Sequence, residues 1–154
     1  MHTELIDTFY TSLANQNGDA MAACYHDQAV FEDPAFGELN ADDARDMWRM
    51  LCASGTDLSV RHTILDDSDT SATVNWIADY TFSATGRSVT NDVTANLRFQ
   101  DGLIVDHRDH FDFWKWSRQA LGAPGLLLGW TPILKSKVRA TTRSNLDEFQ
   151  AARG

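Results

Sequence analysis

The feature that most restricts the fold of this sequence is a change of hydrophobic period near residue 57. Before this point, apolar residues recur at the spacing of amphipathic helices. After it, residues 58–66, 72–83, 88–100 and 103–114 alternate between apolar and polar side chains, which is typical of half-buried strands. The links between these segments are short turns, and such links join antiparallel strands. The sequence therefore predicts a four-stranded antiparallel meander preceded by helices.

Three helices and one short strand are predicted before the meander. Residues 3–15 form the first amphipathic helix, and Asp19 is the predicted N-cap of a short helix that continues to Tyr25. The strand Ala29–Glu32 ends at a proline, and the next helix is predicted to end at Ser54-Gly55. Helices followed by an antiparallel sheet predict an α+β fold in which helices cover one face of the sheet.

The chain beyond Trp116 has a different pattern, so we divide the sequence into a domain over residues 1–116 and an extension over residues 117–154. Gly122-Ala123-Pro124-Gly125 is predicted to interrupt regular structure, and a short apolar run, Leu126–Leu134, precedes a basic final helix. The extension packs on the same domain or on a dimer partner. Three roles remain open: a lid, a dimer arm, or a peripheral membrane contact, of which the first two are favoured because peripheral binding normally uses a longer amphipathic helix.

Composition excludes several classes of protein. A length of 154 residues suits one core, and a net charge of −9 argues against nucleic acid as a partner. No apolar run approaches the ~20 residues of a membrane-spanning helix, so no integral membrane segment is expected. No basic start is followed by an apolar run, which predicts a cytoplasmic protein without a signal peptide. Cys24 and Cys52 are predicted to be buried, reduced thiols.

Two motifs, together with the order of predicted elements, carry a family resemblance. Phe31-Glu32-Asp33-Pro34 closes the first strand, and Arg108-Asp109-His110-Phe111-Asp112 closes the meander. Over residues 3–116 the sequence resembles the SnoaL-like and ketosteroid isomerase-like proteins of the nuclear transport factor 2-like superfamily. The resemblance implies a cone-shaped, curved antiparallel sheet packed on N-terminal helices around an apolar pocket. It also implies a homodimer formed through the outer face of the sheet.

Asp33 is the first catalytic candidate. By resemblance it stands where the ketosteroid isomerases carry their general base. A carboxyl at the end of a strand beside apolar residues is partly desolvated, which raises its pKa toward the range useful for proton transfer. The alternative is that Asp-Pro only starts a turn.

His107 and Asp109 are the second pair of catalytic candidates. They are predicted to share one strand face with Phe111 and Phe113, so both polar groups are expected to be buried and to need partners. By resemblance, Asp109 matches an acid/base aspartate in the closing strand of limonene-epoxide hydrolase-like enzymes. The alternative is a structural histidine–aspartate pair. The spacing of this pair also suits part of an iron site that His62 would have to complete, but no metal is expected.

Tyr10 and His62 are further candidates. Tyr10 lies close to the position of the isomerase tyrosine, which implies a hydroxyl donor, and the alternative is an ordinary core tyrosine. His62 shares a predicted strand face with Val60 and Ile64, so it is expected to point inward as a proton carrier or as a core histidine. A set of aromatic residues is predicted to line the apolar pocket: Phe31, Trp48, Trp76, Phe82 and Phe111. The same residues would also suit a filled core.

The sequence also departs from its relatives. The isomerases keep an acidic oxyanion donor where this chain has Ala95, and the epoxide hydrolases keep an arginine and an aspartate where it has Trp76 and Ala78. Their tyrosine and asparagine near the first strand become Phe31 and Asp33. A steroid isomerase or a limonene-type hydrolase is therefore disfavoured.

Three hypotheses follow. The leading one is an acid/base enzyme of the isomerase, cyclase or dehydratase type that needs no cofactor and acts on a small apolar carbonyl or polyketide-like molecule. The second is a non-catalytic binder of an apolar small molecule. The third is a structural dimer module, which a solid core around Asp33 would favour.

Overall fold

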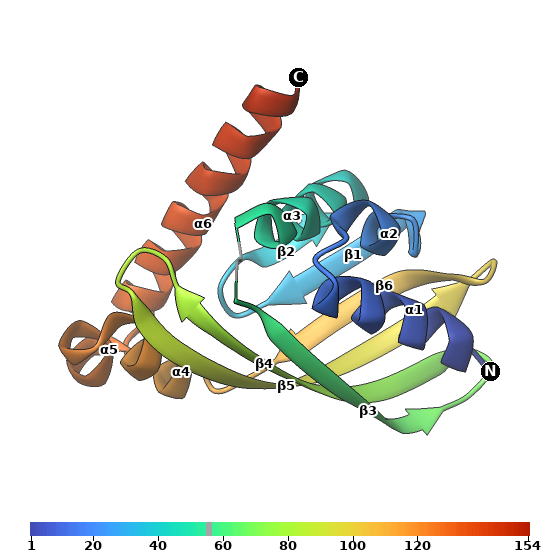
Figure 1. Ribbon diagram of the computed structural model, residues 1–154, viewed down its shortest axis with the longest axis horizontal. Helices are drawn as coiled ribbons and strands as arrows, with labels where there is room; N and C mark the ends of the chain where they lie inside the picture. The colour runs from blue at the N-terminus through green and yellow to red at the C-terminus, as the bar shows by residue number, and fades with distance from the viewer. Residues whose placement is uncertain (55–56) are drawn as a thin grey trace.

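A six-stranded curved sheet forms the body of the protein, and helices cover one of its faces (Figure 1). The computed structural model describes residues 1–54 and 57–154. Gly55, where the third predicted helix was expected to end, lies outside the described residues. The helices are α1 Thr3–Ala14, α2 Gly18–Ala22, α3 Ala41–Ser54, α4 Phe113–Leu121, α5 Ala123–Leu128 and α6 Pro132–Arg153. The strands are β1 Tyr25–Asp33, β2 Gly37–Asn40, β3 Ser59–Asp67, β4 Ser71–Phe82, β5 Arg87–Gln100 and β6 Leu103–His110.

The strand order is β2-β1-β6-β5-β4-β3, with β3 to β6 forming the predicted antiparallel meander. β1 joins this meander in parallel beside β6, where Phe31 pairs with His107 and Glu32 with Arg108. β2, which the sequence did not indicate, folds back antiparallel on β1. The α+β fold with a curved, unclosed sheet and a C-terminal helical extension is thus confirmed.

The last strand is shorter than predicted, and this corrects the placement of two aromatic residues. β6 ends at His110, so Phe111 and Phe113 do not continue the strand face of His107 and Asp109. The reason is a helix cap: the Asp112 carboxylate accepts a hydrogen bond of 3.0 Å from the Lys115 N–H and starts α4.

Two further predictions were wrong for similar local reasons. The second helix begins after Asn17, whose side chain accepts a hydrogen bond from the Ala20 N–H, and it ends at Ala22 rather than at Tyr25. The expected break at residues 122–125 instead starts α5, because Pro124 lies in the first helical turn, where no partner is needed for its missing N–H.

The main core fills the space between the concave face of the sheet and α1 to α3. Ile6, Phe9 and Leu13 of α1 are buried there, and a smaller cluster of Val89, Phe113, Trp116 and Ala120 lies under α4. Cys24 and Cys52 are buried and free, as predicted, and burial raises the pKa of each thiol to about 11. No helix in the described part of the chain is long and apolar enough to cross a bilayer.

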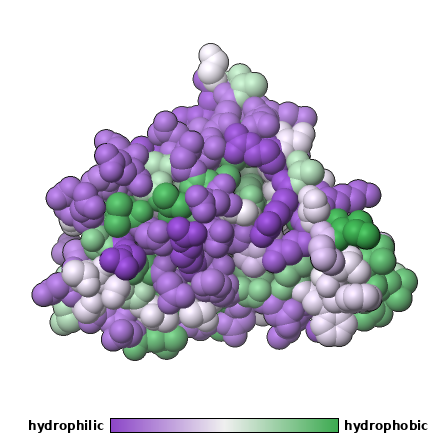
Figure 2. Space-filling view, turned by 180° about the vertical axis from the view of Figure 1, so that it is seen from behind, coloured by the Kyte–Doolittle hydropathy of each residue, from purple (hydrophilic) through white to green (hydrophobic). Residues whose placement is uncertain are grey.

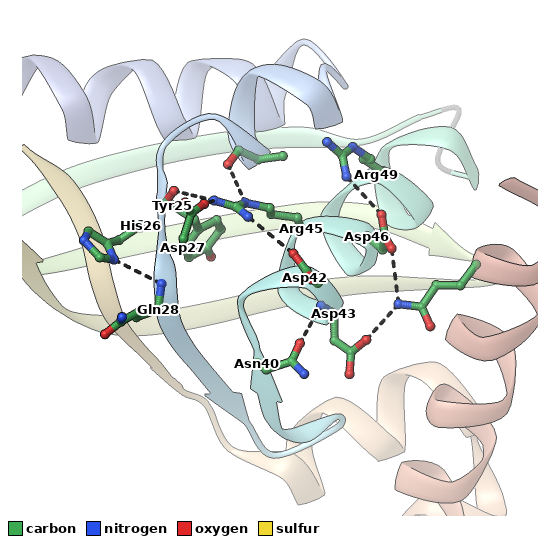
Figure 3. Close-up of polar contacts among 12 residues, drawn as sticks. Tyr25, His26, Asp27, Gln28, Asn40, Asp42, Asp43, Arg45, Asp46 and Arg49 are labelled. Carbon is green, nitrogen blue, oxygen red and sulfur yellow. Dashed lines mark hydrogen bonds and ion pairs between the residues drawn. The ribbon is translucent and has the colours of Figure 1, made fainter. Parts of the chain in front are cut away.

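Helix α3 connects the first strand to the C-terminal extension. Figure 3 shows Arg45 reaching the start of β1, where it donates to the Tyr25 carbonyl oxygen at 2.9 Å and to Asp27 at 2.8 Å. On its other side, α3 meets α6: Gln150 donates to Asp43 at 2.8 Å, and Leu146 is fully buried. The extension therefore packs on the domain of its own chain.

We expect the extension to contribute to the stability of the domain through Leu146. Leu146→Ala should lower the free energy of unfolding by about 2–4 kcal/mol, because it removes a buried side chain and leaves a cavity. Leu127→Ala, the same change at a side chain that is 66% exposed, should change it by less than about 0.5 kcal/mol. Denaturant unfolding of both variants measures the difference. Equal effects would contradict the packing of α6 on α3.

Candidate functional site

The parallel pairing of β1 with β6 brings two carboxyl groups together on the concave face. Neighbouring residues in a parallel pair point to the same side of the sheet, and Phe31 beside His107 points inward. Two residues further along each strand, Asp33 and Asp109 follow on the same face. The strand face predicted for His107 and Asp109 thus also carries Phe31 and Asp33 from the neighbouring strand.

A chain of hydrogen bonds crosses the apolar core behind these carboxyl groups. The Trp48 indole N–H donates to the Tyr25 hydroxyl oxygen at 2.8 Å, and this hydroxyl lies 2.7 Å from His107 Nδ1. His107 Nε2 lies 2.8 Å from Asp109 Oδ1, which also accepts from the Trp76 N–H at 3.4 Å. All five side chains are at least nine-tenths buried. We call this set the buried polar chain.

The donors at the two ends give the buried polar chain a direction. An indole N–H only donates, so the Tyr25 oxygen accepts from Trp48 and its own hydrogen is free to go to His107 Nδ1. Burial raises the pKa of Tyr25 well above its usual value, which keeps that hydrogen in place. His107 then carries its proton on Nε2 and donates it to Asp109. The arrangement that uses every donor therefore ends on the Asp109 carboxylate.

Aromatic rings hold the His107 ring in position. Phe9 and Phe31 meet it edge to face at centroid distances of 5.6 and 4.9 Å, and Trp48 stacks on it at 6.2 Å. His107 itself has no exposed surface. A ring fixed in this way cannot turn to exchange its two nitrogen partners, so it orients Asp109 as a fixed donor.

Asp33 lies at the end of β1, where it is half-buried and forms a turn. Its Oδ1 accepts hydrogen bonds from the backbone N–H groups of Ala35 at 2.9 Å and Phe36 at 2.6 Å. Loss of water around the carboxyl raises the pKa of Asp33 to about 7, with a further increase from the charge of Asp109 that the two N–H groups oppose. The residue is therefore both a turn former and a carboxyl that titrates near neutral pH.

Helix α6 supports this turn from outside. The Arg139 side chain donates to the Pro34 carbonyl oxygen at 3.2 Å, and the Thr142 hydroxyl donates to the Ala35 carbonyl oxygen at 2.9 Å. These contacts join residues more than 100 positions apart in the sequence. The extension thus fixes the backbone that carries Asp33.

Tyr10 and His62 lie next to each other, but they differ in their partners. Tyr10 is 1% exposed, and its hydroxyl has no hydrogen-bond partner among the described residues. Burial and the nearby charge of Asp109 raise its pKa well above the usual value, so it remains a donor facing the interior. His62 stacks on the Tyr10 ring at 5.2 Å and bonds to the half-exposed Asp7 carboxylate at 2.7 Å. His62 is therefore outside the buried polar chain.

The structure separates the five residues predicted to line a pocket. Phe31, Trp48 and Trp76 lie in the main core around His107 and Asp109. Phe82 belongs to the smaller cluster, where its ring meets Trp116 at 5.6 Å. Phe111 is partly buried and contacts both clusters.

Two tyrosine side chains near the candidate site were not recognised as candidates in the sequence. Tyr25 connects Trp48 to His107, and the alternation of β1 would have placed it on the face of Phe31 and Asp33. Tyr80 accepts a 2.9 Å hydrogen bond from the Trp116 N–H, and burial raises the pKa of Tyr80, with a smaller increase from the nearby charge of Asp33. Tyr80 lies on the same face of β4 as Trp76, and a hydroxyl group among apolar side chains could have marked it as a candidate.

Two open grooves in the described part of the chain lie beside α1, lined by residues between Met1 and Ser12, and neither includes Asp33 or Asp109. Within residues 1–54 and 57–154, no group of three or more His, Cys, Asp or Glu side chains is placed to hold a metal ion.

Comparison with known families identifies the domain. A family model described as the SnoaL-like domain matches residues 6–107. The chain belongs to the SnoaL-like family. This confirms the family resemblance that the sequence predicted. A comparison with curated proteins finds no match for this SnoaL-like protein.

Several solved structures share the fold. A proposed polyketide cyclase from Silicibacter superposes with a TM-score of 0.69 at 15% identity, over 77% of this chain and 94% of that one. A ketosteroid isomerase-like protein from Catenulispora acidiphila, in complex with trimethylamine, has a TM-score of 0.66 at 16% identity, over 86% and 100%. A proposed isomerase from Bacillus subtilis has a TM-score of 0.64 at 15% identity, over 79% and 92%. At these identities the likeness shows the fold alone.

Two tyrosine variants test the buried polar chain. Tyr25→Phe should lower the free energy of unfolding by about 1–3 kcal/mol, because it leaves the Trp48 N–H and His107 Nδ1 buried without partners. Tyr10→Phe removes a hydroxyl that has no partner among the described residues and should leave stability unchanged or slightly raised. Denaturant unfolding of the two variants provides the comparison. An equal loss of stability in both variants would contradict the hydrogen bonds of the buried polar chain.

The raised pKa of Asp33 predicts a pH-dependent stability. The folded protein holds the Asp33 proton up to about pH 7, whereas the unfolded chain releases it near pH 4, so stability is lost as pH rises through this window. Asp33→Asn keeps the oxygen that caps the turn and should remove a loss of roughly 1–4 kcal/mol between pH 4.5 and pH 8. Unfolding curves of both proteins across that range measure it. Parallel pH profiles would show that Asp33 is solvated.

Proposed function

We propose that this SnoaL-like protein is an acid/base enzyme acting on a small apolar carbonyl or polyketide-like molecule, without a cofactor. The observation that carries the proposal is that Asp33 and Asp109 follow on the same face of neighbouring strands, close enough for the charge of Asp109 to raise the pKa of Asp33. One carboxyl titrates near neutral pH, and the other is fixed by the buried polar chain. Two adjacent carboxyl groups in different environments can take different protonation states, which is what a proton-transfer site needs.

In the proposed step, the Asp33 carboxylate takes a proton from the carbon next to a substrate carbonyl. The electron pair of that C–H bond moves into the carbon–carbon bond of an enolate, and the negative charge moves to the carbonyl oxygen. Tyr10 supplies a hydrogen bond to this oxygen, because its hydroxyl is buried and has no acceptor among the described residues. Asp33 then returns its proton to a different carbon for isomerisation, or to a leaving hydroxyl for dehydration.

His107 and Asp109 act differently from Asp33 in this proposal. His107 is fully buried between Tyr25 and Asp109, so it orients Asp109 and takes no part in contact with substrate. Asp109 keeps the local potential negative, which favours the protonated form of Asp33 after proton abstraction. His62 is a surface partner of Asp7 and has no role in the proposed step.

The substrate must reach Asp33 from the side of its own turn. Phe36, Tyr80 and Phe111 are only partly buried against the core, whereas the residues behind Asp109 are fully packed. These three aromatic side chains are the proposed walls of an entrance that widens when a flat apolar molecule binds. The neighbours described as proposed polyketide cyclases are consistent with such a ligand.

A non-catalytic binder is the second candidate function. The Tyr10 hydroxyl, which has no partner among the described residues, favours a bound oxygen atom. Ala95 pairs with Asp109 at the position where the isomerases keep an acidic oxyanion donor, and the lack of that donor favours binding without catalysis.

We also propose a homodimer through the outer face of the sheet, acting in the cytoplasm. That face carries polar cross-strand pairs such as Asn75 with Asp92 at 2.6 Å, which suit a hydrated interface.

Proton exchange tests catalysis without knowledge of the natural substrate. The protein is incubated in deuterated buffer with small cyclic ketones, such as 2-tetralone, and loss of the α-proton signal is followed by NMR. Wild type should accelerate exchange, and the rate should rise with pH through about 7 as Asp33 loses its proton. Asp33→Asn should reduce the enzymatic rate by about 100-fold or more.

Arg139→Gln is the matched control for Asp33→Asn, because it tests the position of Asp33 and not its carboxyl group. It removes one of the contacts that hold the Asp33 turn and leaves the carboxyl in place, so it should lower the rate less than Asp33→Asn does. Exchange that is unaffected by Asp33→Asn would remove Asp33 from the mechanism. Ketone binding seen by native mass spectrometry, together with no exchange by the wild type, would select the binder instead.

A further inference from the structure

An apolar surface lies at one end of the molecule, on α5 and the segments beside it. Figure 2 shows hydrophobic atoms gathered at the right-hand edge of the view, where this end of the chain lies. The exposed fractions are 66% for Leu127, 73% for Trp130 and 80% for Ile133. We call this surface the apolar tip, and its members are Trp114, Leu126, Leu127, Leu128, Trp130 and Ile133.

The packing of α5 turns its leucines outward. Gly125 lies directly against α4, where a Cβ atom would fall 1.9 Å from the Ser117 carbonyl oxygen. Gly129 is equally close, with a Cβ position 2.1 Å from the Ser117 hydroxyl oxygen. The inward positions of this helix are thus occupied by glycine, and the three consecutive leucines between them remain on the surface. The arrangement is the reverse of a helix that packs its apolar face on a core.

The two tryptophans of the apolar tip have no free polar group. The Trp114 N–H donates to the Leu126 carbonyl oxygen at 3.2 Å, and the Trp130 N–H donates to the Leu127 carbonyl oxygen at 3.0 Å. Both indoles can therefore enter an apolar medium without losing a hydrogen bond to water. The same bonds also satisfy carbonyl groups near the end of α5.

Charge is segregated around the apolar tip. Residues 113–146 contain six basic residues and no acidic one, whereas the rest of the chain has seven basic against 22 acidic residues. Lys115 and Lys137 are exposed and have no ion pair within the described residues. Arg118 stacks over the Trp114 ring at 4.2 Å, and Lys135 lies over the Phe113 ring at 5.9 Å. An acidic protein thus has an apolar surface bordered by positive charge.

We propose that the apolar tip is a peripheral docking site for a lipid bilayer that contains anionic headgroups. The leucines, Trp130 and Ile133 insert at the level of the headgroups, and the lysines and arginine around them meet the lipid phosphates. The inference does not rest on the proposed function, because no residue of the apolar tip takes part in the proposed proton transfer.

Charge also distinguishes a bilayer from a second copy of the chain. A symmetric dimer through the apolar tip would place the basic border of one copy against the basic border of the other. Like charges at such an interface oppose association. An anionic bilayer instead has charge complementary to the border and an apolar interior complementary to the leucines. The observations therefore favour lipid.

Vesicle sedimentation of the full chain tests the proposal. The protein should bind vesicles of phosphatidylcholine mixed with phosphatidylglycerol more tightly than vesicles of phosphatidylcholine alone. The double variant Leu127→Gln/Trp130→Gln should weaken binding to mixed vesicles at least tenfold, since it removes the apolar contact. Leu65→Gln is the matched control on β3, where Leu65 is 59% exposed and lies outside the apolar tip, and it should bind as wild type does.

Charge variants provide a second, independent measurement. Lys115→Gln and Lys137→Gln should each weaken binding to the mixed vesicles about fivefold, and the effect should shrink as salt is added. Thermal unfolding confirms that these surface variants are folded. Failure of the wild type to sediment with mixed vesicles, or equal binding by wild type and the double variant, overturns the proposal. A dimer in light scattering that the double variant converts to a monomer, without vesicle binding by the wild type, assigns the apolar tip to a second copy.

Discussion

The need to satisfy buried polar groups governs the centre of this fold. Tyr25, His107 and Asp109 lie in an apolar core with almost no exposed surface, and each would be costly there without partners. Two indole N–H groups close the chain at its ends and give every member a donor or an acceptor. Because its members come from α3, β1, β4 and β6, the buried polar chain also fixes how these four elements pack. The register between β1 and β6 and the position of Asp33 depend on it.

Asp33 is held by opposing influences that originate far apart in the sequence. Its own turn supplies two N–H groups that favour the charged form, while desolvation and Asp109 favour the protonated form. Helix α6 fixes the outside of that turn through Arg139 and Thr142. Deep burial of the carboxyl alone would raise its pKa beyond the useful range, and full exposure would leave it ionised. The balance near pH 7 therefore depends on the turn and on β6, and the extension holds the turn in place.

The sequence predicted well where local pattern and tertiary packing agree. The alternation of β4 placed Trp76 on the inner face, and the motif around Asp33 indicated a strand that ends in a turn. It predicted poorly where one side chain decides a boundary, as at Asp112, whose cap ends the strand and moves Phe111 and Phe113 out of it. The hydrogen-bond partners of Tyr25 and His107 come from three separate elements, α3, β1 and β6. No local pattern encodes the contact between Tyr25 and His107, so the sequence indicated only the His107–Asp109 part of the buried polar chain.

The two proposals meet at α4. Its Trp116 donates to the Tyr80 hydroxyl, which lies near Asp33, while Trp114 on the outer side of the same helix belongs to the apolar tip. A flat apolar molecule of the kind proposed for the site partitions into bilayers, because burial of its surface in hydrocarbon is favourable. A protein docked through the apolar tip would therefore hold the proposed entrance, between Phe36, Tyr80 and Phe111, close to the phase in which such a substrate is concentrated. The lipid contact would then serve substrate capture, and the buried polar chain would orient Asp109 for the proposed proton transfer.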